Sequence, residues 1–257
     1  MFKRILLKLS GEALKGKNFN IDPQIVKKIA EEIKEIKDLN IEIIIIVGAG
    51  NIWRGLLGQE LGMVRSQSDY MGMLGTIINS LALQDALNNL QVETRVMTAF
   101  SVTAISEPYI KERAIRHLEK NRVVILGAGL GLPYFSTDTA AALRSAELNV
   151  DAILMAKNGV EGVYNKDPKK YDDAVLLKNL QYKDIIYQRL NIMDITAVSL
   201  CWENKIDILV FDMNIKGNIK KVILKENIGT LITSKEEKCG KFIEGNSNKN
   251  RIENVNN

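Results

Sequence analysis

Short runs of apolar residues, many of them β-branched, alternate along this chain with longer segments in which apolar residues recur at helical spacing. A short apolar run bounded by turn residues is typical of a buried strand, whereas recurrence every three or four residues is typical of a helix. We therefore expect strands at residues 4–9, 41–47, 95–99, 123–126, 152–156, 206–211 and 229–233.

The first expected helix follows Asp22 and Pro23, because Asp can cap exposed N–H groups and Pro fits the first helical position. Its residues Ile25, Ile29 and Ile33 share one face, and Lys and Glu occupy the other. Further helices are expected at residues 68–90, 111–119 and 218–224, and after the capping residues Asp138 and Asp194. In the long helix we expect the apolar face to consist of Met71, Leu74, Ile78, Leu81 and Leu83.

The run at residues 41–47 consists of β-branched residues apart from Glu42, so we expect a fully buried strand, which is typical of parallel sheets covered on both faces. Strands that alternate with helices favour an α/β fold. We predict a three-layer sandwich with a mostly parallel central sheet, formed by one domain over residues 1–235. Residues 236–257 are polar and without periodicity, which predicts a disordered C-terminal tail.

Composition narrows the function. The 257 residues include 46% hydrophobic ones, and the net charge of +4 comes from basic and acidic residues spread along the chain, which argues against nucleic acid as a partner. His117 is the single histidine, and Cys201 and Cys239 are far apart, so a zinc site and His-dependent nucleophilic catalysis are excluded. The apolar runs are too short to span a membrane and no signal peptide is recognised, so we expect a cytoplasmic protein without a membrane partner.

The segment at residues 127–142, GAGLGLPYFSTDTAAA, joins an apolar strand to a capped helix through three glycines. Free N–H groups and the helix dipole both favour an anion at such a turn. An ordinary strand-to-helix turn with a capping Asp is the alternative. Residues 11–18, GEALKGKN, follow Walker A spacing, but Asn18 replaces Ser or Thr and no helix follows directly, so we reject a P-loop.

A second glycine turn follows the strand at residues 41–47, and Arg54 lies just beyond it, where it could hold a phosphate. Lys8 lies near the end of the first strand. The carboxyl ends of parallel strands share one edge, so these groups predict a site for several phosphates. Phosphoryl transfer needs positioning and charge neutralisation, which Lys8 and Arg54 supply, while Asp138 and Asp194 could orient lysine or hold magnesium.

At these positions the chain resembles the bacterial UMP kinases (uridylate kinases) of the amino acid kinase family. The resemblance covers about residues 3–234, in the family's order of motifs. Its motifs are KRILLKLSGEAL at residue 3, GAGNIWRG at 48, SDYMGMLGT at 68, GLGLPYFSTDTAAALRSAE at 129, AKNGVEGVYNKDP at 156 and MDITA at 193.

The resemblance implies transfer of the γ-phosphoryl group of ATP to UMP, with Mg²⁺ carried by ATP. The implied catalytic residues are Lys8, Arg54, Asp138 and Asp194. The implied ATP-binding residues are Lys8, Leu9, Ser10, Gly11, Gly50, Arg54, Asn158, Tyr164 and Asp167. The implied UMP-binding residues are Ala49, Asp69, Leu130, Gly131, Leu132, Pro133, Tyr134, Phe135, Ser136 and Thr137.

The resemblance further implies a homohexamer, activation by GTP and inhibition by UTP, and Lys157 is a candidate second catalytic lysine. Ala49 stands where relatives often have Gly, and residues 16–20 differ from the loop linked to GTP activation. Two alternatives stay open. One is a kinase of the same fold that phosphorylates a carboxylate or carbamate, and the other is a non-catalytic nucleotide sensor, which would not need Lys8, Asp138 or Asp194.

Overall fold

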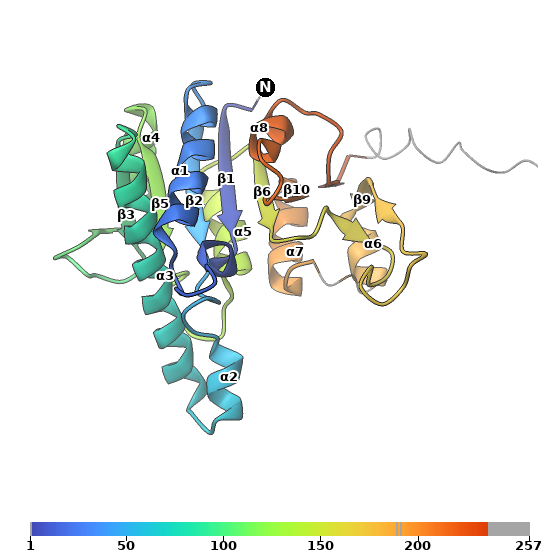
Figure 1. Ribbon diagram of the computed structural model, residues 1–257, viewed down its shortest axis with the longest axis horizontal. Helices are drawn as coiled ribbons and strands as arrows, with labels where there is room; N and C mark the ends of the chain where they lie inside the picture. The colour runs from blue at the N-terminus through green and yellow to red at the C-terminus, as the bar shows by residue number, and fades with distance from the viewer. Residues whose placement is uncertain (1, 189, 191, 236–257) are drawn as a thin grey trace, which may run out of the picture.

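A computed structural model describes residues 2–188, 190 and 192–235 (Figure 1). Within these residues, nine strands form one sheet in the order β4-β3-β5-β2-β1-β6-β10-β11-β9, and every neighbouring pair is parallel except β10 and β11. The strands are β1 (Arg4–Leu9), β2 (Glu42–Val47), β3 (Thr94–Thr98), β4 (Glu107–Pro108), β5 (Val123–Gly127), β6 (Ala152–Lys157), β9 (Asn179–Gln181), β10 (Asp207–Asp212) and β11 (Thr230–Thr233).

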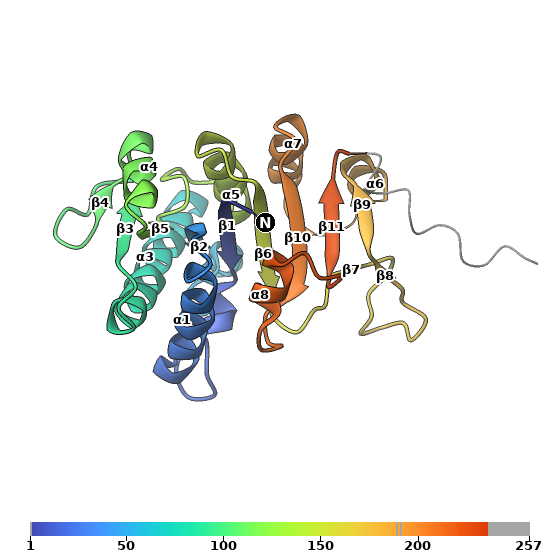
Figure 2. The same cartoon turned by 90° about the horizontal axis from the view of Figure 1, so that it is seen from above.

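Helices cover both faces of the sheet, which confirms the predicted three-layer α/β sandwich (Figure 2). One face is covered by α1 (Pro23–Lys37), α3 (Arg65–Asn89) and α8 (Asn218–Ile223), and the other by α4 (Lys111–Glu119), α5 (Thr137–Glu147) and α7 (Ile195–Glu203). Shorter elements complete the described fold: the 3₁₀ helix η1 (Gly11–Leu14), α2 (Gly55–Glu60), α6 (Tyr182–Tyr187) and the antiparallel pair β7 (Val163–Tyr164) and β8 (Leu176–Leu177).

The central strand β1 lies between β2 and β6, and its side chains divide between the two cores. Ile5, Leu7 and Leu9 pack toward α1 and α8, while Leu6 packs into the core shared with α5 and α7. All four are fully buried. Burial on both faces explains why this strand reads as a nearly continuous apolar run, with Lys8 as its exception.

Helix α1 begins as its sequence predicts. Asp22 is the N-cap and accepts a hydrogen bond from the Gln24 amide at 2.9 Å, and Pro23 is the first helical residue. The segment that imitates a Walker loop forms η1 and a turn instead, since the Gly16 amide donates to the Phe19 carbonyl at 2.9 Å. Its rejection as a P-loop is therefore confirmed.

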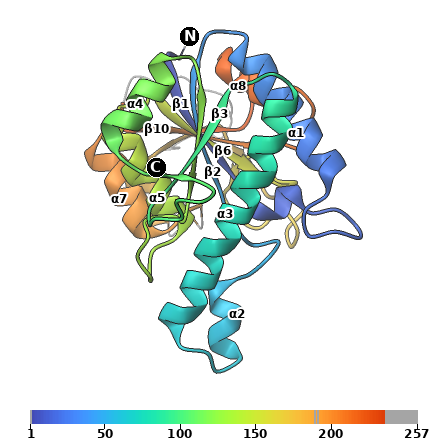
Figure 3. The same ribbon diagram turned by 90° about the vertical axis from the view of Figure 1, so that its left-hand side faces the viewer.

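Helix α3 differs from its prediction in start and in face. It begins at Arg65, three residues before the expected position, and Leu74 and Ile78 are each 50% exposed instead of buried. Its buried apolar residues include Met73 and Ile77. The physical reason is visible in Figure 3, where α2 and the first half of α3 project beyond the sheet and therefore have no sheet to cover on one side.

Short elements escaped the sequence analysis because one turn of helix carries too few residues for a period to show. These are η1, α2 and α6. The predicted tail, residues 236–257, lies outside the described residues. Among the described helices, none combines the length and apolar character that a bilayer crossing needs.

Candidate active site

The carboxyl ends of β1, β2, β5 and β6 lie at one edge of the sheet because these strands are parallel. Lys8 is the last but one residue of β1, and its side chain is only 12% exposed. Its Nζ lies 2.7 Å from Asp138 Oδ1 at the start of α5. The Gly48 amide donates to the Leu9 carbonyl at 3.0 Å, which places the second glycine turn beside the same strand end.

The N-termini of α5 and α7 are joined at this edge. Ser136 caps α5, because its Oγ accepts from the amides of Asp138 at 2.9 Å and Thr139 at 3.1 Å. Asp194 caps α7 by accepting from the Ala197 amide at 2.8 Å. The Oδ2 of Asp194 also accepts from the hydroxyls of Ser136 and, at 2.9 Å, Thr139. Asp194 therefore fixes the helix start that presents Asp138 to Lys8.

A second lysine lies next to this pair. Lys157 ends β6, and its Nζ donates to the Ile192 carbonyl at 2.9 Å. Burial lowers the pKa of Lys157, the positive charge of Lys8 lowers it further, and Asp138 opposes the shift. Lys8, Asp138 and Lys157 thus form one electrostatic group of two cations and one carboxylate.

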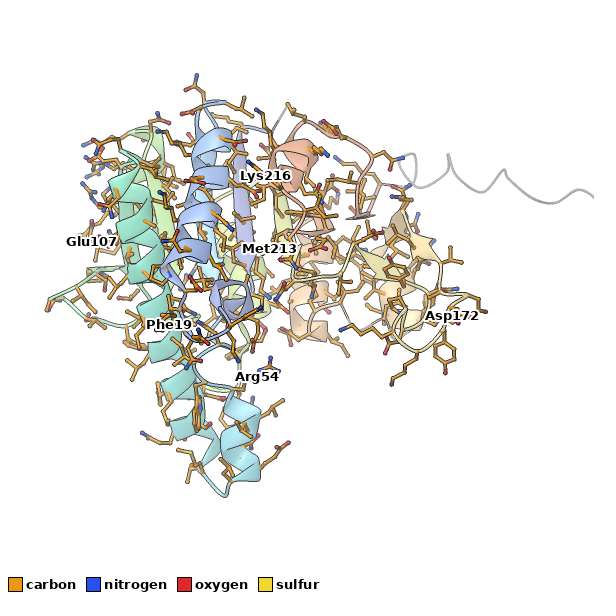
Figure 4. All side chains as sticks on the ribbon, in the orientation of Figure 1. Phe19, Arg54, Glu107, Asp172, Met213 and Lys216 are labelled. Carbon is orange, nitrogen blue, oxygen red and sulfur yellow. The ribbon has the colours of Figure 1, made fainter. Side chains whose placement is uncertain are left out.

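The glycine turn after β2 packs closely against the residues that follow β1. A Cβ on Gly11 would stand 2.5 Å from both the Gly48 carbonyl oxygen and Asn51 Oδ1, so only glycine fits there. Arg54 follows this turn and pairs with Glu12 at 2.8 Å, although most of its side chain is exposed. It lies between η1 and α2 in Figure 4. Arg54 therefore stands at the surface, paired with a carboxylate of η1.

One cavity, here called the α3 cavity, has a volume of about 480 Å³ and lies between α3, α5 and the glycine loop after β5. Seven of the ten residues predicted to bind UMP line it, and Gly131, Leu132 and Pro133 do not. Its lining consists of Ala49, Trp53, Gly55, Leu56, Arg65, Asp69, Gly72, Met73, Thr76, Gly129, Leu130, Tyr134, Phe135, Ser136, Thr137, Thr139, Asp194 and Thr196.

Asp69 is held on the wall of the α3 cavity by two groups. Its Oδ2 accepts from the Tyr134 amide at 2.8 Å, and the Arg65 Nε donates to Oδ1 at 2.9 Å and to Oδ2 at 2.8 Å. The sequence analysis did not identify Arg65, because it placed this residue before the helix. Trp53 is likewise new, and its Nε1 donates to the Ser68 hydroxyl at 3.0 Å.

The glycine loop after β5 has an unusual backbone. Left-handed φ angles occur at Ala128, Gly129, Gly131 and Tyr134, with values of 64°, 55°, 75° and 72°. Such angles are unfavourable for residues with a Cβ and persist only where the surroundings enforce them. The Ala128 amide is held by the Thr76 hydroxyl at 2.8 Å, and Tyr134 is held by Asp69. The loop is therefore shaped in advance around the α3 cavity.

A second cavity, here called the β7 cavity, has a volume of about 520 Å³, and Lys157 forms part of its lining. Tyr164 and Asp167, two of the residues predicted to bind ATP, line it. Asn158 does not, and it accepts from Asn214 Nδ2 at 2.7 Å instead. The lining consists of Lys157, Val160, Gly162, Val163, Tyr164, Asn165, Lys166, Asp167, Pro168, Gln188, Leu190, Ile192 and Val210.

The arrangement provides two ligand-sized cavities with a cationic centre between them. Thr137 and Thr139, on either side of Asp138 in the chain, line the α3 cavity, and Lys157 lines the β7 cavity. No group of three or more His, Cys, Asp or Glu in the described part of the chain could hold a metal ion. A geometry of this kind suits transfer of an anionic group from one ligand to another.

The chain is thus an α/β protein that has its ligand cavities at the carboxyl ends of parallel strands, where open α/β sheets bind ligands. The sequence profile of the amino acid kinase family matches residues 3–212, so the chain belongs to this family. A uridylate kinase of Aster yellows witches'-broom phytoplasma is 72% identical over 239 residues, which cover 92% of this chain and 99% of the relative. A uridylate kinase of Pediococcus pentosaceus is 55% identical over 236 residues, covering 91% and 98%.

Solved structures agree with the family assignment. The crystal structure of UMP kinase from Bacillus anthracis is 42% identical, superimposes with a TM-score of 0.88 and covers 91% of this chain and 96% of its own. The crystal structure of UMP kinase from Ureaplasma parvum is 40% identical, with a TM-score of 0.85 and coverage of 90% and 98%. The predicted fold and family are therefore confirmed.

Proposed function

We propose that this protein is an ATP-dependent nucleoside monophosphate kinase that transfers the γ-phosphoryl group of ATP to UMP, giving ADP and UDP. The carrying observation is the Lys8–Asp138 pair, at 2.7 Å, between two cavities of nucleotide size. The uridylate kinase relatives, at 72% and 55% identity, name the acceptor. The reaction belongs to pyrimidine nucleotide biosynthesis, and we place it in the cytoplasm.

We assign UMP to the α3 cavity. Asp69 and the start of α5 both line it, so they can hold the sugar and the phosphate of one nucleotide. The phosphate would lie at the N-terminus of α5, where the helix dipole favours an anion. The residues assigned to UMP are Ala49, Asp69, Leu130, Gly131, Leu132, Pro133, Tyr134, Phe135, Ser136 and Thr137.

We assign ATP to the β7 cavity and to the edge beside β1. Tyr164 offers an aromatic surface for adenine, and the turns after β1 and β2 bring backbone amides toward the phosphates. The residues assigned to ATP are Lys8, Leu9, Ser10, Gly11, Gly50, Arg54, Asn158, Tyr164 and Asp167. Mg²⁺ would be carried on the phosphates, because it prefers few protein carboxylates together with phosphate oxygens.

The catalytic role of the protein is to position charge. Lys8 would lie next to the transferring phosphoryl group. Its positive charge would matter most there as the bond to the leaving oxygen breaks. Asp138 orients Lys8, and Asp194 orients Asp138 through the caps of α5. Arg54 would move from Glu12 to the phosphates of ATP. The phosphate charge of bound ATP would oppose the lowering of the Lys157 pKa.

Both alternatives remain distinguishable from a UMP kinase. A kinase acting on a carboxylate or carbamate would not need room for a sugar. In this chain α2 and α3 extend the lining of the α3 cavity. A non-catalytic sensor would not need a lysine held in a partly desolvated ion pair. Both features therefore favour the nucleotide kinase.

The decisive experiment compares acceptors. Purified protein with ATP and Mg²⁺ is tested with UMP, CMP, AMP and glutamate while ADP release is followed in a coupled assay. We expect UMP to give the highest kcat/KM. A higher value for any other acceptor overturns the assignment, and the absence of ADP release with all four acceptors favours the sensor.

We further propose a homohexamer that GTP activates and UTP inhibits. The support for assembly is the projecting part of α3, where Tyr70, Leu74 and Ile78 expose an apolar stripe at helical spacing. The support for regulation is the bond from Asn51 Nδ2 to the Asn20 carbonyl at 2.8 Å, which connects the loop of residues 16–20 to the turn that contains Gly50. Activity with and without GTP or UTP tests the regulators.

A further inference from the structure

We propose that Arg65 is a positioning residue that makes the site select acceptors with a ribose 2′-hydroxyl, by fixing Asp69 toward the α3 cavity. This inference rests on the proposed function, because it assigns the acceptor nucleotide to that cavity. It concerns a residue that neither the sequence motifs nor the assigned roles include.

The first step is that Asp69 is the carboxylate available to the acceptor. Among the described residues that line the α3 cavity, the carboxylates are Asp69 and Asp194. Asp194 is committed to the starts of α5 and α7, because it accepts from the Ala197 amide and from the hydroxyls of Ser136 and Thr139. The acceptor phosphate is assigned to that end of the cavity, so Asp69 on α3 is the carboxylate left to accept a hydrogen bond from a sugar hydroxyl.

The Asp69 carboxylate has one hydrogen-bond acceptor site left for a ligand. A carboxylate has about four acceptor sites. Three of those of Asp69 are used, two by the Arg65 Nε and one by the Tyr134 amide, and they leave Oδ1 with an open site. Asp69 is only 12% exposed, so an acceptor that lacks the matching hydroxyl leaves a nearly buried lone pair without a partner. A 2′-deoxy nucleotide is such an acceptor.

The third step is that Arg65 determines where Asp69 points. Its Nε bridges both carboxylate oxygens, and its Nη1 donates to Gln59 Oε1 of α2 at 3.0 Å. The guanidinium also lies 5.6 Å from the centroid of the Tyr134 ring. A planar fork held at three points leaves the carboxylate one orientation, which a flexible lysine would not enforce. Arg65 therefore connects α2, α3 and the acceptor loop at the sugar position.

The test compares UMP with 2′-deoxy-UMP in wild type, Arg65→Gln and Arg65→Lys. In wild type we expect the kcat/KM for 2′-deoxy-UMP to be at least about tenfold lower than for UMP. In Arg65→Gln we expect the KM for UMP to rise roughly tenfold to hundredfold with kcat little changed, and the preference for UMP to shrink to about threefold or less. Arg65→Lys should lie between the two.

The matched control is Arg113→Gln, which removes an arginine of α4 that pairs with Glu107 at 3.8 Å. It should leave both KM values and their ratio unchanged. If an Arg65 variant raises the KM values for UMP and 2′-deoxy-UMP by the same factor, Arg65 does not act on the 2′-hydroxyl, and the inference is overturned. Equal turnover of both acceptors by the wild type overturns it as well. A wild type with no turnover of UMP overturns the proposed function as well, so the two failures are distinguishable.

Discussion

At the scale of single residues, Lys8 interrupts the apolar run that follows Arg4 in the central strand. Placing a cation at 12% exposure costs desolvation energy, and the Asp138 carboxylate at 2.7 Å offsets part of it. Lys157 adds a second cation nearby, which raises that cost. Two nearly buried cations close together lower the stability of the fold at this edge. We attribute their presence to the reaction, which needs positive charge there.

We predict that Lys8→Met lowers kcat by roughly a hundredfold to a thousandfold, the usual effect of removing one preorganised charge at a reacting group. The KM for UMP should change much less, because UMP binds in the α3 cavity. Steady-state kinetics with both substrates varied measures this split. The control Lys34→Met, on the exposed face of α1, should keep wild-type rates. Near-normal turnover of Lys8→Met contradicts the assigned role.

Residue positions were predictable where an element boundary marks them. Lys8 precedes a turn, Asp138 and Asp194 begin helices, and the structure brings Lys8 and Asp138 together at the expected edge. Arg65 was not predictable, because Ser68 offers the stronger capping signal and yet lies inside α3, where its hydroxyl donates to the Gly55 carbonyl. A tertiary contact there replaces the local one.

At the scale of elements, two buried amides connect α3 to the turn after β2. Asn51 and Asn79 donate to each other at 3.0 and 2.8 Å, and Asn79 also donates to the Gly48 carbonyl at 2.7 Å. Both side chains are buried. The pair provides a hydrogen-bond partner for the Gly48 carbonyl, which would otherwise be buried without one. It therefore holds the glycine turn against the long helix.

We predict that Asn79→Leu lowers the free energy of unfolding by about 1–3 kcal/mol, because the Gly48 carbonyl and the Asn51 amide lose their buried partner. Urea unfolding measures the change. Asn51→Leu combined with Asn79→Leu should cost less than the sum of the single changes, since the two residues share one network. Asn89→Leu, exposed at the end of the same helix, serves as control, and additive costs would contradict the proposed network.

Elements with several turns or a continuous apolar run were predictable. Helix α1 begins at the expected residue, and both ends of α4 and β6 agree with their expected ranges to within one residue. The face of α3 was not predictable. Periodicity identifies an apolar stripe but not the partner that covers it, and the stripe through Leu74 and Ile78 faces away from the sheet. Glycines Gly72 and Gly75 dilute the pattern further.

At the scale of the whole molecule, the projecting hairpin of α2 and α3 carries apolar surface that the described sheet does not cover (Figure 3). Leu56, Leu61 and Val64 are each well over half exposed. Several exposed apolar side chains on one projecting hairpin suggest a surface that another protein covers. It is the physical basis for proposing that copies of this chain assemble through α3.

We predict that Leu74→Glu together with Ile78→Glu reduces the size of the assembly, because two buried carboxylates at an apolar contact would lack partners. Sedimentation velocity measures the mass in solution. The control Lys27→Glu changes charge on the exposed face of α1 and should leave the mass unchanged. Retention of wild-type mass by the double variant contradicts assembly through this stripe.

The position of β1 at the middle of the sheet has a consequence for biosynthesis. In chain order β1 is the first of the described strands, and it pairs on one side with β2 but on the other with β6, where Ile5 is opposite Ala152. Lys8 is therefore translated long before Asp138 and Lys157 exist to surround it. A chain that ended before α5 would contain both glycine turns and lack the Asp138 carboxylate that holds Lys8, so we expect it to be inactive.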